Sequence, residues 1–85
     1  MILVGTIATQ PRLANVGQGT DIGHSRKTFL LANASDNSQI SCMASGRFSG
    51  TVPSIGTRVT LVGDLMQTFV GAGQQIPVFM FDEIS

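Results

Sequence analysis

The sequence predicts an all-β fold in which five strands close into one small barrel. The first observation is residues 1–13, which read as one long bent strand of β-formers, with Gly5 at the bend and alternating residues up to Pro11. The second observation is that residues 61–65 repeat the pattern of residues 3–7, with Gly63 in the place of Gly5. A glycine in the middle of a strand marks a bulge or a sharp bend. Two such strands are typical of a small closed barrel, in which bent strands serve both halves of the wall.

The other elements follow from alternation and from turn residues. Residues 11–25 read as a long loop, because Asn, Asp and Gly residues supply turn chemistry and apolar residues are few. A polar turn at residues 35–38 joins the second strand to the third as a hairpin, with Phe29 and Leu31 on one face of the second strand. The expected strands are residues 1–11, 26–34, 39–45, 57–70 and 74–84.

The segment between the third and fourth strands, residues 46–56, is rich in glycine. We expect a loop there with at most a turn or two of helix, in which Phe48, Val52 or Ile55 plugs one end of the barrel. Five strands with these connections match the OB-fold barrel, here with a reduced helix between strands three and four. The residues expected inside the barrel are Leu3, Ile7, Phe29 or Leu30, Met43, Leu61, Leu65 and Phe79.

Length and composition limit what the chain can be. Its 85 residues make one domain, residues 1–85, with a single small core. The formal net charge is zero, so binding to nucleic acid has to be local and modest. No apolar run could span a membrane and no secretory signal is expected, which favours a cytoplasmic, organellar or phage-encoded protein. One cysteine, Cys42, and one histidine, His24, predict neither a disulfide nor a metal site, and no cofactor is expected.

The opening and fourth strands also carry a family resemblance. Residues 1–13 (MILVGTIATQPRL) and 56–65 (GTRVTLVGDL) resemble strands of the bacterial and phage single-stranded-DNA-binding proteins, and more loosely of primosomal replication protein N. Residues 28–32, 46–48 and 81–84 are similar to the family's second strand, exit from strand three and closing strand. The resemblance covers nearly the whole chain. It implies an OB-fold barrel that stacks bases on aromatic side chains beside a basic groove, in DNA replication, repair or recombination.

The chain departs from that family at its stacking positions. Those of strand three fall near Gln39 and Ser45, which cannot stack, and only Phe69 lies close to a family stacking position. Phe69 is open to two interpretations, a stacking platform or a cap on the core. The cations are open to two as well, scattered surface charges or a thin basic track. The residues expected to bind nucleic acid are Arg12, Arg26, Lys27, Arg47 and Phe69.

Two functions are consistent with these residues. The first is weak, sequence-independent binding of single-stranded DNA, with RNA as the alternative ligand and replication proteins as further partners. The second is a self-associating structural or adaptor barrel that has lost nucleic-acid binding and contacts other proteins. An enzyme is not expected and we assign no catalytic residue, because no nucleophile, base and orienting residue can be assembled around His24.

The first strand predicts a homodimer or a homotetramer. An apolar edge strand is either covered or used for pairing, and a net charge of zero removes the repulsion that keeps subunits apart. The resembled family pairs its subunits along this region. The expected interface is Met1, Ile2, Leu3 and Val4.

Overall fold

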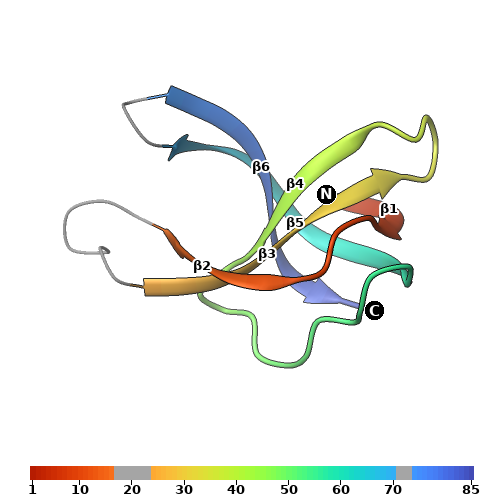
Figure 1. Cartoon of the computed structure of the whole chain (residues 1–85), viewed down its shortest axis with the longest axis horizontal. Coiled ribbons are helices and arrows are strands. Elements are labelled where there is room, and N and C mark those ends of the chain that lie inside the picture. Colours follow the sequence, from red (N-terminus) through yellow and green to blue (C-terminus); the bar gives the residue numbers. More distant parts are fainter. Residues whose placement is uncertain (17–23, 71–73) are drawn as a thin grey trace.

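The computed structural model describes the backbone of residues 1–16, 24–70 and 74–85, and the side chains of residues 1–13, 26–67 and 76–85. Figure 1 shows the strands wound into a barrel from which two strand pairs, β2–β3 and β5–β6, project on one side. The strands are β1 (Ile2–Ile7), β2 (Arg12–Val16), β3 (His24–Asn33), β4 (Gln39–Ala44), β5 (Arg58–Val70) and β6 (Gln74–Ile84). Within the described part of the chain, no helix is long and apolar enough to cross a membrane.

Five of the strands form a closed ring. Their order is β1-β5-β6-β4-β3, and β3 pairs back onto β1 to complete the barrel. The β4–β6 pair is parallel and the other pairs are antiparallel. This is the five-stranded mixed barrel of the OB-fold, as the sequence predicts. The sixth strand, β2, is added to the free edge of β3 outside the ring.

The opening stretch is two strands, and the single strand predicted over residues 1–11 is wrong. The ladder is interrupted at residues 8–11, where Pro11 has no N–H to donate. Thr9 holds the interruption in place by accepting the backbone N–H of Leu30 on its hydroxyl oxygen at 2.9 Å. The predicted loop over residues 11–25 is also wrong at both ends, because β2 pairs with the start of β3, from Arg12 with Thr28 to Val16 with His24. The long edge of β3 supplies a partner that local turn composition does not reveal.

Two glycines allow the ring to close, as their mid-strand positions predict. Gly5 lies between β3 and β5, paired with Asn33 on one side and with Val59 on the other. A Cβ atom there would collide with the carbonyl oxygen of Ala32. Gly63 lies at a register shift in the β5–β6 ladder, and a Cβ atom there would lie 2.7 Å from the Cα atom of Phe81. Both positions therefore require the absence of a side chain.

The core fills the barrel with side chains from all five ring strands. Phe81 is its centre, with ring centroids 5.6 Å from Phe29 and 5.2 Å from Phe48. Phe48 and Val52 are partly buried and pack against this core, whereas Ile55 is exposed. The connection over residues 45–57 contains turns but no helix, so these two side chains replace the expected reduced helix. The buried cluster is Ile7, Phe29, Leu31, Cys42, Ala44, Val59, Leu61, Phe79 and Phe81.

The core prediction is confirmed for Ile7, Phe29, Leu61 and Phe79. Met43 is buried, but it lies outside the core cluster, on the face of β4 opposite Cys42 and Ala44. Leu3 is half-buried and packs against the core cluster from its edge.

Leu65 is a wrong assignment, because 55% of its surface is exposed. β5 pairs with β1 as far as Val62, and beyond Gly63 its ladder is with β6. Leu65 therefore lies where β5 leaves the barrel wall and projects with β6 (Figure 1).

Because the thiol of Cys42 is buried, we expect the protein to lose stability in alkaline solution. Its thiol is buried in the core, donates to the carbonyl oxygen of Ile40 at 3.6 Å, and has its pKa raised by burial from 9.0 to about 12. The unfolded thiol ionises from about pH 9 while the folded one keeps its proton. The stabilising contribution is therefore complete below pH 9 and is lost as the pH rises towards 12, by at most about 1.4 kcal/mol per pH unit.

Urea unfolding across this pH window measures the effect. The chain contains no tyrosine and a single lysine, the exposed Lys27, so few other groups titrate there. In Cys42→Ala the free energy of unfolding should fall much less steeply as the pH rises. If it falls as steeply as in the unsubstituted protein, ionisation of the thiol is not the cause.

Candidate functional site

The outer face of the barrel carries charged, hydroxyl and thioether side chains on four adjacent strands. Alternate residues of a strand point to opposite faces of the sheet. The residues that alternate with the buried cluster along β3, β4, β5 and β6 therefore face outwards. The outward-facing residues that concern the site are Arg26 and Thr28 on β3, Met43 on β4, Met80 and Asp82 on β6, and Asp64 and Met66 on β5.

Strand register sets these side chains in a row. Thr28 pairs with Met43, Met43 with Met80, and Met80 with Asp64, so one line crosses four strands. Met43 is buried, Met80 is half-buried, and Met66 is exposed. Met66 lies two residues beyond Asp64 on the same face of β5, so the three methionines run from the protein interior to the surface and offer a soft, polarisable floor.

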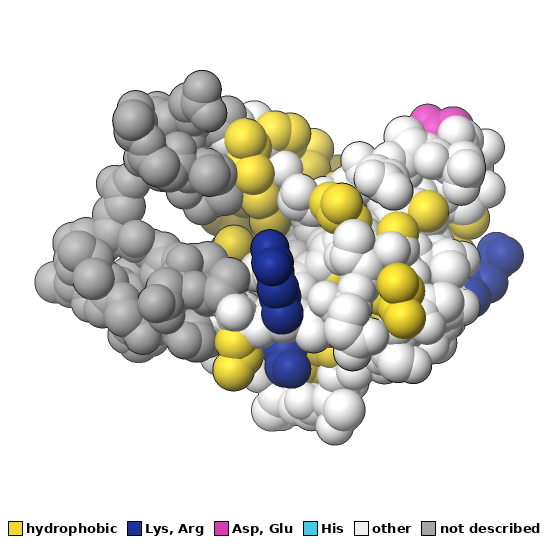
Figure 2. All heavy atoms as spheres, in the orientation of Figure 1, with side chains coloured by type: hydrophobic (Ala, Val, Ile, Leu, Met, Phe, Trp, Pro, Cys, Tyr) yellow, Lys and Arg dark blue, Asp and Glu magenta, His cyan; other side chains and the backbone are white. Residues whose placement is uncertain are grey.

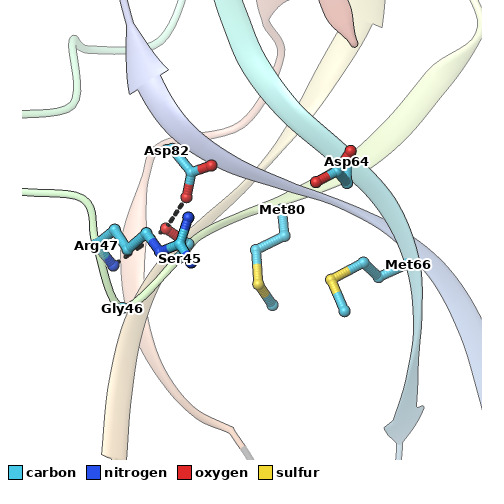
Figure 3. Close-up of a pocket in the computed structure, with 7 residues that line it drawn as sticks. All are labelled: Ser45, Gly46, Arg47, Asp64, Met66, Met80 and Asp82. Atoms are coloured by element: carbon cyan, nitrogen blue, oxygen red, sulfur yellow. Dashed lines mark hydrogen bonds between the residues drawn. The ribbon is translucent and has the colours of Figure 1, made fainter.

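A hollow of about 420 Å³ opens above Met66 and Met80, and we call it the methionine hollow. Figure 3 shows the two methionine side chains lying beside each other, with Arg47 and Ser45 to one side and Asp64 on the strand that borders the other. Gly46 and Asp82 complete its lining. The hollow thus combines an apolar floor with one cationic and two anionic side chains.

Hydrogen bonds fix the turn that carries Arg47. The Ser45 hydroxyl donates to a carboxylate oxygen of Asp82, and the same hydroxyl oxygen accepts the backbone N–H of Arg47 at 3.2 Å. The backbone N–H of Ser45 donates to the carbonyl oxygen of Phe81 at 2.9 Å. The backbone from which the Arg47 side chain extends is therefore tied to β6 at two points.

Three of the predicted cations share this outer face. A Cβ atom at Gly46 would lie 3.3 Å from Nη2 of Arg26, so the guanidinium of Arg26 lies over the residue that precedes Arg47. Arg12 pairs with Thr28, which places it on the same face as Arg26 and one diagonal step away. Figure 2 shows Lys and Arg atoms as a column near the centre of the drawn face, between patches of apolar atoms.

The fourth predicted cation, Lys27, lies apart from this group, and so does Arg58, the remaining cation of the chain. Lys27 pairs with Leu13 on the opposite face of β3. Arg58 pairs with Thr6, which in turn pairs with Ala32, six residues further along β3 than Arg26. That is a separation of roughly 20 Å along the strand.

The side chain of Phe69 lies outside the described residues, and the family stacking position near Gln39 is an exposed site at the start of β4.

The residues expected at an oligomer interface form an open edge. Met1 and Ile2 are 70% and 68% exposed, and Leu3 and Val4 are half-buried. On the β5 side this segment is paired, down to the bond from the Gly63 N–H to the Met1 carbonyl oxygen. On the β3 side the Ala34 N–H donates to the Val4 carbonyl oxygen at 2.9 Å. The backbone of Ile2 and Leu3 is thus paired along one edge.

The methionine hollow has little signature in the sequence. In the sequence, Ser45 stands out only as a position that cannot stack a base, and nothing marks Met66, Met80 or Asp64 as site residues. The alternation of Met80 and Asp82 on the face opposite Phe79 and Phe81 is the one pattern that could have indicated it.

Among the described residues, no group of three or more His, Cys, Asp or Glu side chains could hold a metal ion. Comparison of the chain with models of known protein families, with curated proteins and with solved structures found no match.

Proposed function

We propose that this OB-fold barrel binds single-stranded nucleic acid weakly and without strong sequence preference, and that it acts in DNA replication, repair or recombination. Single-stranded DNA is the first ligand and RNA the alternative. The observation that carries the proposal is the position of the Arg26 guanidinium over Gly46, beside Arg47, on the outer face of the barrel. Paired cations next to an apolar floor are the combination with which proteins hold a phosphate backbone while bases rest on side chains.

Charge limits the strength of this binding. The chain is neutral overall, and Asp64 and Asp82 lie close to the cations, so long-range attraction of a strand is small. If Arg12, Arg26 and Arg47 each neutralise one phosphate, the slope of log affinity against log salt is about −0.7 per contact, or roughly −2 per subunit. The sequence suggests Phe69 as a stacking residue, and one base stacked on it would add about 1–3 kcal/mol of binding free energy. Useful affinity therefore requires several subunits on one strand.

Self-association supplies those subunits. The exposed apolar side chains of Met1 and Ile2, next to a backbone edge, suit the pairing of two copies along β1. Linked subunits raise the effective concentration of each next contact on the strand. A homodimer or a homotetramer is accordingly part of the proposed binding mechanism.

Removing the two adjacent arginines should weaken binding. In Arg26→Gln/Arg47→Gln, the affinity for fluorescent oligo-dT at low salt should fall about ten-fold, and the salt slope should become shallower by about 1.4, since two phosphate contacts are lost. Fluorescence anisotropy over a salt series measures both quantities. Neither residue belongs to the core cluster, so the melting temperature should stay nearly unchanged.

Arg58→Gln is the control, because it removes one positive charge, where the double variant removes two, at a place roughly 20 Å away along the strand direction. It should leave affinity and salt slope almost as they are. If the loss of log affinity in Arg58→Gln is half that in the double variant or more, the cations act only through overall charge, and the proposed face is wrong.

The second candidate is a structural or adaptor barrel that self-associates and contacts other proteins. The exposed apolar pair Met1 and Ile2 favours it, because such residues at a strand edge mark a protein contact whether or not a strand of DNA is bound. This candidate predicts a dimer or larger species by sedimentation and no salt-sensitive binding of oligo-dT at high micromolar protein. The first candidate predicts both self-association and binding.

A further inference from the structure

We propose that the methionine hollow is a base pocket that prefers guanine, so that the protein binds guanine-containing single strands more tightly than matched strands without it. This inference rests on the proposed function, because the base reaches the hollow as part of a bound strand. The volume of about 420 Å³ falls within the range of small-ligand sites, about 300–1,000 Å³.

The floor of the hollow suits a flat aromatic ring. Met66 and Met80 come from neighbouring strands, and Figure 3 shows their thioether ends turned into the same space. Methionine sulfur makes favourable contacts with aromatic rings, and its unbranched side chain adapts to their shape. Such a floor accepts any base, so the preference has to come from the polar groups around it.

Those polar groups select for hydrogen-bond donors on the base. The exposed carboxylate of Asp64 has two oxygens that only accept, and it stands next to Met66 and Met80. Guanine presents two adjacent donors, N1–H and N2–H, which fit a carboxylate in parallel. Cytosine and adenine each present one amino group beside an acceptor nitrogen, and thymine presents one N–H between two carbonyl oxygens. A bidentate fit is therefore open to guanine alone.

The cations complete the site by holding the strand on either side of the base. Arg47 lines the hollow, and Arg26 lies over Gly46 at its rim. Both are long side chains with rigid donor forks that bind phosphate oxygens. Asp82 has one oxygen engaged by Ser45, which leaves Asp64 as the carboxylate free to meet the base.

Replacing guanine by inosine tests the pocket, because inosine keeps the ring and N1–H and lacks the N2 amino group. Fluorescence anisotropy would compare a thymine–guanine repeat, a thymine–inosine repeat and oligo-dT of equal length. We expect the guanine strand to bind about five-fold more tightly than the inosine strand, which is the lower end of the discrimination that one bidentate base contact gives. In Asp64→Asn the ratio should fall to about one.

Glu83→Gln is the matched control, since Glu83 is an exposed carboxylate on β6 that does not line the hollow. It should keep the five-fold ratio. Equal binding of the two repeats by a protein that binds oligo-dT overturns the guanine pocket and leaves the proposed function intact. Loss of the ratio in Glu83→Gln as well also overturns it, because the effect would then be one of net charge. Failure to bind any of the three strands overturns both proposals.

Discussion

Gly63→Ala should unfold the protein or reduce its stability by several kcal/mol. A Cβ atom at this position would collide with the carbonyl oxygen of Met80 and lie 2.7 Å from the Cα atom of Phe81. Both obstacles are backbone atoms of β6, which pairs with β4 and β5 and cannot move without opening the ring. Substitutions that force backbone shifts in a packed core are among the most destabilising, and a domain of this size has only about 5–10 kcal/mol to lose. Circular dichroism during urea unfolding measures the change.

Gly46→Ala is the control for the loss of glycine itself. A Cβ atom there would lie 3.3 Å from the end of the Arg26 side chain, which can rotate away. The free energy of unfolding of Gly46→Ala should stay within about 0.5 kcal/mol of that of the unsubstituted protein, as for most surface changes. A Gly63→Ala protein as stable as Gly46→Ala would contradict the closure of the barrel at this bulge.

Leu61→Ala and Leu65→Ala should have very different effects, although the same residue type is removed from the same strand. Leu61 is fully buried in the core cluster, and its truncation should cost about 2–5 kcal/mol of the free energy of unfolding. Leu65 is 55% exposed beyond the Gly63 bulge, and its truncation should cost less than about 1 kcal/mol. Urea midpoints of the two variants give the comparison directly. Equal losses would mean that β5 stays in the barrel wall past the bulge.

Local pattern was sufficient to predict the barrel. Alternation identified the strands around Phe29 and Phe79, and the repeated glycines at Gly5 and Gly63 marked the places where the ring closes. Leu65 keeps the alternation of Leu61 and pairs with the buried Phe79, and it was misplaced because strand alternation carries no record of where a strand leaves the wall. Strand β2 was missed for a related reason, since its pairing depends on the long edge of β3 and not on its own composition.

The candidate site was predictable only in part. The sequence supplied the cations, but their grouping depends on tertiary register, which brings Arg12 and Arg26 together and sends Lys27 to the other face. Met80 lies on a different strand from Asp64 and Met66, and none of the three is of a type that marks a site by itself. Only the β5–β6 ladder aligns them beside the turn at Arg47. Side chains that meet across strands leave no spacing rule in a single sequence.

Mapping the backbone amide shifts by NMR during a titration with oligo-dT tests the central claim, that a single strand binds the outer face around the methionine hollow. Binding at this face should give salt-sensitive shifts at Ser45, Gly46, Arg47 and Met80, and leave the amides of Thr6 and Arg58 on the far part of the barrel unchanged. Shifts centred on Thr6 and Arg58, or an unchanged spectrum at high micromolar oligo-dT, would contradict it.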